Sequence, residues 1–270
     1  ALEMTRLIVL AALLFAVPAQ AVVNIDWVTV GDAGNSCETQ TQGCFGAVSD
    51  EYRIDKYEVT NAQYTEFLNA VAATDTNLLY NPNMGSGFGG ITRSGSSGSF
   101  SYSTIAGRED MPVNYVSWYD SLRFANWLHN SQPTGAQDTT TTEDGAYDMS
   151  LGSSVVRESG ATVYLTSEDE WYKAAYYKGG GTSAGYWDYP AVSDAQTSCT
   201  APGATANTAN CSGGTGELTD GGSYTGSASP NGTFDQGGNV WEWNEALISG
   251  SNPGIRGGGF GNGATYLATS

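Results

Sequence analysis

The sequence predicts an irregular, loop-rich α+β fold with short helices and short antiparallel strands. Glycine contributes 36 of the 270 residues, about twice its usual share, which indicates many turns. Three segments show the 3.6-residue spacing of helices, and scattered runs of β-branched and aromatic residues are typical of strands. A hydrophobic content of 40% is sufficient for a packed core and argues against global disorder.

Two strands and a helix are expected near the beginning of the chain. The strands are Val22–Val30 and Tyr52–Val59. Thr60 is placed to cap the helix that follows, and residues 81–108 form a Gly/Ser-rich loop with at most a hairpin. Four residues give the helix its apolar face: Tyr64, Phe67, Leu68 and Val71.

Two further helices carry capping-box signals. Ser117 and Asp120 begin the second helix, and Ser167 and Glu170 begin the third. The third helix is expected to reach Lys178, where Gly179, Gly180 and Gly181 stop it, and a short strand at Thr162–Leu165 should precede it. The apolar stripe of the second helix consists of Trp118, Leu122, Ala125 and Leu128.

The C-terminal third divides into a loop and a sheet. Residues 182–230 show almost no periodicity, and so long a segment needs a disulfide or a metal ion to be ordered. The stretches NGTFDQGGNVWEWNEALISG and GIRGGGF are expected to form two antiparallel strands, with a turn at Asp235–Gly238.

Residues 1–21 have the pattern of a secretory signal peptide. Arg6 precedes the apolar run Leu7–Val17, and Ala19-Gln20-Ala21 supplies an A-x-A cleavage site. The run is short for a transmembrane helix, and a buried N-terminal helix is the alternative. We expect cleavage before Val22 and export to the periplasm, cell surface or medium, which leaves one domain over residues 22–270.

The composition excludes several classes of function. With 10 Lys and Arg against 28 Asp and Glu, the net charge is −18. Such a chain repels phosphate, so we expect no nucleic-acid partner and no binding to anionic lipid. The single histidine, His129, excludes sites that need two or three imidazoles, and its place at a helix end suits a surface role.

The four cysteines form two local pairs. An exported protein meets an oxidising compartment, so we expect the disulfides Cys37–Cys44 and Cys199–Cys211, although four cysteines allow three connectivities. Neither pair has CxxC spacing or a neighbouring histidine, which makes zinc and redox interpretations weak.

Two groups of oxygen ligands could bind Ca²⁺. In DQGGNVWEW, the Asp235 and Glu242 carboxylates flank a turn whose Gly238 and Val240 carbonyls can point to the same side. An ordinary hairpin with an exposed aspartate is the alternative. A weaker second group contains Asn210, Asp220 and the turn at Gly221-Gly222. There the Cys199–Cys211 disulfide alone could order the loop.

Five motifs, in this order, resemble one family. YEVTNAQYTEFLNAV, MPVNYVSWYDSLRFANWL, YLTSEDEWYKAAYY, GTFDQGGNVWEW and RGGGF are similar to the formylglycine-generating enzymes and their sulfatase-modifying-factor relatives over about residues 25–260. The resemblance implies a C-type-lectin-like core and structural Ca²⁺. It places one calcium on Asp235, Gly238, Val240 and Glu242. It places a second on Asn210, Cys211, Asp220 and Gly222.

The activity of this family does not follow from the resemblance. Formylglycine-generating enzymes bind Cu(I) through two thiolates just after the R/K-G-G-S motif, and soft thiolates are what Cu(I) requires. Here the motif is Arg256–Phe260, with Gly259 for serine, and the cysteine positions hold Asn262 and Leu267. The related iron-dependent sulfoxide synthases need three histidines. Copper, and catalysis by the usual route, are therefore not expected.

Two main hypotheses follow. The first is a pseudoenzyme, a calcium-stabilised extracellular binding module that recognises a protein or glycan ligand through aromatic-rich loops. The second is an oxidoreductase acting on protein cysteine, or related family chemistry. The family continues beyond the point where this chain stops, so we also expect a fragment. Any membrane attachment would come from an anchor beyond Ser270, and a poorly folding remnant is the third reading.

Overall fold

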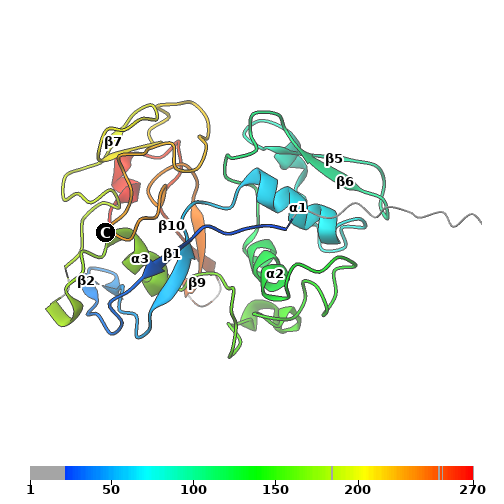
Figure 1. Cartoon of the computed structure of the whole chain (residues 1–270), viewed down its shortest axis with the longest axis horizontal. Coiled ribbons are helices and arrows are strands. Elements are labelled where there is room, and N and C mark those ends of the chain that lie inside the picture. Colours follow the sequence, from blue (N-terminus) through cyan, green and yellow to red (C-terminus); the bar gives the residue numbers. More distant parts are fainter. Residues whose placement is uncertain (1–21, 184, 249, 251, 270) are drawn as a thin grey trace, which may run out of the picture.

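The computed structural model describes residues 22–183, 185–248, 250 and 252–269; the expected signal peptide lies outside these residues. Figure 1 shows two halves side by side, one containing the helices and hairpin of residues 61–129 and the other containing residues 27–55, 168–176, 242–248 and 252–256. None of the described helices is long and apolar enough to cross a membrane. The mixture of short helices and small sheets confirms the expected α+β fold.

The described strands pair into five two-stranded sheets, four of them antiparallel. The pairs are β1 (Trp27–Val30) with β4 (Tyr52–Asp55), β2 (Glu38–Gln40) with β3 (Gly43–Phe45), β5 (Ile91–Ser94) with β6 (Ser101–Thr104), β9 (Glu242–Ile248) with β10 (Asn252–Arg256), and the parallel pair β7 (Ser198–Cys199) with β8 (Thr208–Ala209). The β5–β6 pair is the hairpin allowed for in the Gly/Ser-rich loop.

Three α-helices begin at the expected capping residues. Thr60, Ser117 and Ser167 each accept a hydrogen bond from the backbone of the third helical residue, whose side chain reciprocates. The helices are α1 (Asn61–Val71), α2 (Trp118–His129) and α3 (Glu168–Tyr176), with short 3₁₀ turns at Pro82–Gly85, Met149–Ser154, Gly181–Ser183 and Ala264–Leu267.

The core follows the apolar faces of these helices. The predicted face of α1 is at most 2% exposed and packs on Phe124 and Trp127 of α2. Tyr172 and Tyr176 of α3 are fully buried in an aromatic cluster with Tyr186. Each half is therefore built around its own helix surface.

Two expected elements are wrong, and the third helix ends early. Thr162–Leu165 forms no strand, because the Leu165 amide donates to the Tyr147 hydroxyl and the Leu165 carbonyl accepts from Arg157. Asp235–Gly238 is a loop before β9 and not the turn between paired strands, since Gly238 donates to the Gly257 carbonyl instead. α3 stops at Tyr176, where Tyr177 bridges to Tyr186.

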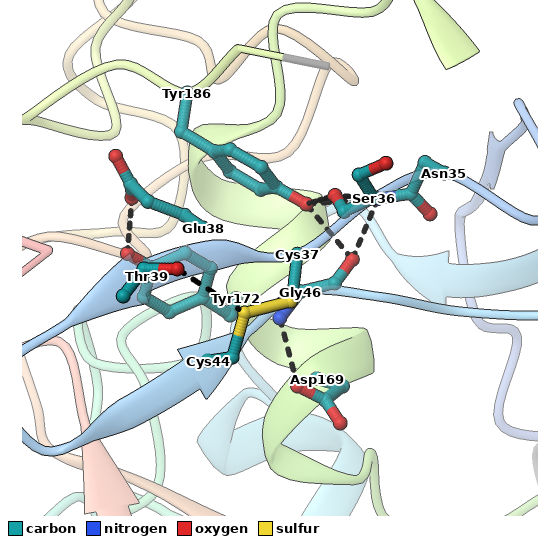
Figure 2. Close-up of a disulfide and its surroundings, with 10 residues drawn as sticks. All are labelled: Asn35, Ser36, Cys37, Glu38, Thr39, Cys44, Gly46, Asp169, Tyr172 and Tyr186. Carbon is teal, nitrogen blue, oxygen red and sulfur yellow. Dashed lines mark hydrogen bonds between the residues drawn. A yellow bond between two sulfur atoms is a disulfide. The ribbon is translucent and has the colours of Figure 1, made fainter. Parts of the chain in front are cut away.

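Both expected disulfides are present and include all four cysteines. Figure 2 shows Cys37–Cys44 joining the hairpin β2–β3 beside α3, where Asp169 accepts a hydrogen bond from the Gly46 amide and the Tyr172 hydroxyl bonds to Glu38. Cys199–Cys211 joins β7 to the segment after β8, so a covalent link orders the long loop. Two disulfides indicate an oxidising compartment.

Arg157 makes the most highly connected ion pair. Its guanidinium donates to both carboxylate oxygens of Glu170 in α3 (2.7 and 3.0 Å) and of Glu245 in β9 (2.7 and 2.8 Å). The same group stacks 3.7 Å above the Tyr164 ring. One side chain thus joins the loop after α2 to a helix N-terminus and a strand.

We expect Arg157→Met to destabilise the protein by about 2–4 kcal/mol, because two mostly buried carboxylates lose their partner. Thermal or urea unfolding would measure the change. The control is Lys178→Met, which breaks the more exposed Lys178–Asp194 pair and should cost under about 1 kcal/mol. Equal effects for both variants would contradict the structural role given to Arg157.

Candidate functional site

The two predicted copper-ligand positions lie beyond β10. The Asn262 side-chain oxygen accepts hydrogen bonds from the Trp241 indole (2.9 Å) and the Gly259 amide (3.0 Å). Leu267 is fully buried in an apolar cluster with Ala209 and Ala264. These two positions hold an amide and an alkyl group. Every cysteine of the given sequence is disulfide-bonded, so none of them offers a free thiol as a replacement.

Two pairs of aromatic rings include Trp241, which bonds to Asn262, and Phe260, which lies two residues before it in the sequence. Trp241 meets Tyr266 edge to face at 5.8 Å, and Phe88 meets Phe260 at 4.8 Å between ring centroids. Trp241, Tyr266 and Phe88 are 37%, 55% and 41% exposed. We call Phe88, Trp241, Phe260 and Tyr266 the aromatic surface. Exposed rings from three separate segments are typical of a recognition surface.

The residues of the first predicted calcium group keep oxygen atoms that accept no hydrogen bond from the described residues. Asp235 accepts a hydrogen bond from the Gly222 amide (2.6 Å), and Glu242 accepts one from the Trp171 indole (2.6 Å). The other oxygen of each carboxylate, and the Gly238 and Val240 carbonyls, accept no hydrogen bond from the part of the chain that the structure describes. This set of hard oxygen donors fits Ca²⁺ in its chemistry.

A calcium ion at this loop would need the Gly238 and Val240 carbonyls as ligands in addition to the two carboxylates. Within the described residues, no three His, Cys, Asp or Glu side chains are arranged to hold a metal ion. Gly238 has φ +99° and Asn239 φ +57°, a conformation that turns the loop back on itself. The side chain of Asn239 fixes this turn by bonding to Thr219 and Glu58.

Burial raises the pKa of several acids around this loop. It raises the pKa of Asp235 to about 6 and that of Glu242 to about 8, and the negative charge of Asp235 adds to the second effect. Burial, and then the charges of Asp235 and Glu242, raise the pKa of Glu58 well above its usual range. Burial also raises the pKa of Asp55 to about 7. All four carboxyls therefore resist ionisation when no cation is near.

The second predicted calcium group is used differently. The Asn210 side-chain oxygen accepts from the Thr215 hydroxyl, and the Cys211 carbonyl accepts from the Gly214 amide. The Asp220 side chain is exposed, while Gly222 contributes its amide to Asp235. The structure therefore connects Gly222 to the first group and directs the Asn210 oxygen to a protein partner.

A cavity of about 250 Å³ lies between the two halves. Its wall includes Tyr64 and Phe124 from α1 and α2, and Tyr52 and Trp243 from β4 and β9. Three carboxyl-bearing residues also line it, namely Asp55, Glu58 and Glu242. The rim includes Trp241 of the aromatic surface, so the cavity and that surface are continuous.

Sequence reasoning missed Asp55 and Glu58. Both lie in YRIDKYEV, which was interpreted only as a strand. β4 ends at Asp55, and Glu58 is 8% exposed with both oxygens bonded, to the Asn239 amide group (2.6 Å) and the Val240 amide (3.2 Å). Half of this run is charged, so the local pattern did not single out Glu58, whose partners lie about 180 residues away.

Comparison with known proteins agrees with this architecture. The model of the sulfatase-modifying factor enzyme 1-like domain matches residues 28–267. The chain belongs to this family. No curated protein sequence matches the chain.

Two solved structures share the fold of this sulfatase-modifying factor domain. CarF is 20% identical over 92% of each chain, with a TM-score of 0.50. Treponema denticola variable protein 1 is 16% identical over 93% of this chain and 91% of its own, with a TM-score of 0.52. At these identities the likeness concerns the fold alone.

In the absence of divalent cations, we expect the melting temperature to fall by at least about 5 °C between pH 5 and pH 8. In the unfolded chain the acids ionise near pH 4, whereas burial delays ionisation of Asp55, Asp235 and Glu242 in the folded protein. The unfolded state therefore binds fewer protons over this range, and stability falls as pH rises.

Calorimetry in chelator measures this slope. Glu242→Gln should reduce it, whereas Glu51→Gln, at an exposed position before β4, should leave it unchanged. A melting temperature that rises from pH 5 to pH 8 would contradict the buried-acid interpretation.

Proposed function

We propose that this chain is an exported binding domain and not a copper-dependent cysteine oxidase. The observation that carries the proposal is that both disulfides together use all four cysteines. Cu(I) needs soft thiolate ligands, and the amide of Asn262 and the side chain of Leu267 are poor replacements. The Asn262 oxygen is moreover already bonded to Trp241 and Gly259.

Export is supported by two independent features. The sequence of residues 1–21 has the order of a signal peptide, and two disulfides suit an oxidising compartment. The net charge of −18 disfavours association with phosphate-rich partners such as nucleic acids.

The aromatic surface is the proposed recognition site for an extracellular protein or glycan. Trp241 and Tyr266 together offer ring faces and a hydroxyl group, which suit both the apolar face of a sugar and a protein partner. These rings occupy the region around Asn262, where the family resemblance places catalysis. The scaffold would thus present the same surface for binding.

Ca²⁺ is the proposed structural cofactor, held by Asp235, Glu242 and the carbonyls of Gly238 and Val240. Raised carboxyl pKa values support it, because a divalent cation would favour the ionised acids that burial disfavours. The group at Asn210, Cys211, Asp220 and Gly222 remains a weaker proposal, since the Asn210 oxygen bonds to Thr215.

The copper proposal is tested by titrating the mature protein with Cu(I) under anaerobic conditions, followed by incubation with a Cys-x-Pro-x-Arg peptide under oxygen. We expect no stoichiometric tight binding and no aldehyde by mass spectrometry. Installing Asn262→Cys together with Leu267→Cys should increase copper affinity if these positions correspond to the ligand pair. Aldehyde formation by the unmodified protein would overturn the proposal.

The calcium proposal is tested by melting curves with Ca²⁺ and with chelator. We expect Ca²⁺ at about 100 times its Kd to stabilise the protein by about 2.7 kcal/mol. Asp235→Asn or Glu242→Gln should abolish this response and leave a lower melting temperature than that of the calcium-loaded original. Asp220→Asn, in the second group, should retain most of it. An unchanged melt after chelation would show that the site is not structural.

A further inference from the structure

We infer that the cavity between the two halves binds a small organic amine, whose apolar body lies against the aromatic wall and whose ammonium group meets Asp55 and Glu58. Three observations carry this inference: the apolar wall of the cavity, the two carboxyls without an ion-pair partner, and the volume of the cavity. Neither carboxyl is a proposed calcium ligand, but Glu242, which is one, also lines the cavity, so the experiment is made both with and without calcium.

The wall of the cavity presents mainly carbon. Three of its rings have their polar groups bonded to backbone carbonyls: the Tyr64 hydroxyl to Leu79 (3.0 Å), the Trp243 indole to Val116 (3.0 Å) and the Tyr52 hydroxyl to Glu170. These polar groups therefore need no partner from a ligand. Such a wall favours an apolar or aromatic body and can also attract a cation through the ring faces.

Asp55 and Glu58 line this wall without a basic partner. Of the ion pairs among the described residues, none includes either carboxyl. Arg53 also lines the cavity, with its guanidinium 5.6 Å from the Trp27 ring centre, and Lys56 lies over Tyr57, 3.9 Å from Asp26. Within the described part of the chain, neither base forms an ion pair with Asp55 or Glu58.

One oxygen of Asp55 also lacks a hydrogen-bond partner. Oδ2 is buried and makes no hydrogen bond with the described residues, and an unsatisfied buried acceptor is costly. Glu58 keeps acceptor capacity, because each of its oxygens accepts one hydrogen bond and a carboxylate oxygen can accept two. A protonated amine supplies both the positive charge and the missing donors.

The size and polarity of the cavity argue against a sugar in this place. Its volume of about 250 Å³ lies just below the range of about 300–1,000 Å³ for drug-sized ligands, which suits a small molecule. Only seven of its 28 lining residues carry polar groups other than tyrosine hydroxyls and tryptophan indoles. A polyhydroxylated ligand would lose water over most of this wall without replacing its hydrogen bonds.

The experiment compares two ligands that differ only in charge, phenethylamine and 2-phenylethanol, by isothermal titration calorimetry on the mature protein. We expect the amine to bind at least about tenfold more tightly than the alcohol, as for a charge-assisted hydrogen bond. Trp27, Trp171, Trp241 and Trp243 line the cavity, so binding should also change the intrinsic fluorescence.

Variants then assign the binding to these acids. Asp55→Asn should reduce the preference for the amine at least about fivefold, whereas Glu51→Gln, which removes the same charge from an exposed position, should leave it unchanged. Measurements in calcium and in chelator separate this site from the metal proposal, because the amine preference should persist in both.

Three outcomes would overturn the inference: equal affinity for amine and alcohol, no binding of the amine up to about 10 mM, or tighter binding of methyl glucoside than of the amine. The ligand pair is tested on the unmodified protein, so the comparison holds even where a variant fails to fold. Failure here would leave the copper and calcium results unaffected.

Discussion

Most of this chain runs outside helices and sheets, and its backbone groups must therefore find side-chain partners. Asn126 shows how this is achieved: fully buried in α2, it donates to the Thr142 and Tyr147 carbonyls and accepts from the Tyr147 amide. Asn239 does the same for Thr219. Amide side chains thus take the place of neighbouring strands, and the loops acquire fixed positions without a large sheet.

Arg157 also fixes a loop through its side chain, but with ion pairs in place of amide hydrogen bonds. Glu170 caps α3 through the Ser167 amide and simultaneously receives the Arg157 guanidinium, while Glu245 connects that group to β9. A buried pair adds little net stability by itself, but its separated partners are costly. The link therefore favours one arrangement of the helix, strand and loop over its alternatives, which matters in a fold with five very small sheets.

Local signals predicted the helices correctly because a capping box is complete within four residues. The strand at Thr162–Leu165 failed because its backbone bonds to Tyr147 and Arg157, which no local pattern specifies. The disulfides followed from spacing and compartment. Glu58 was missed for the opposite reason, since it is held by Asn239 and Val240, far along the chain. The cavity that Asp55 shares with Glu58 is likewise built from distant segments.

The cost of the acid cluster is the strongest argument that this region serves a function. Burying several carboxyls away from bases lowers stability, and apolar residues would pack this wall at less cost. Yet donors from distant segments hold the oxygens in place: Gly222 holds Asp235, Trp171 holds Glu242, and Val240 holds Glu58. Hydrogen bonds already orient these acids, so the proposed cation would gain their attraction without further rearrangement of the site.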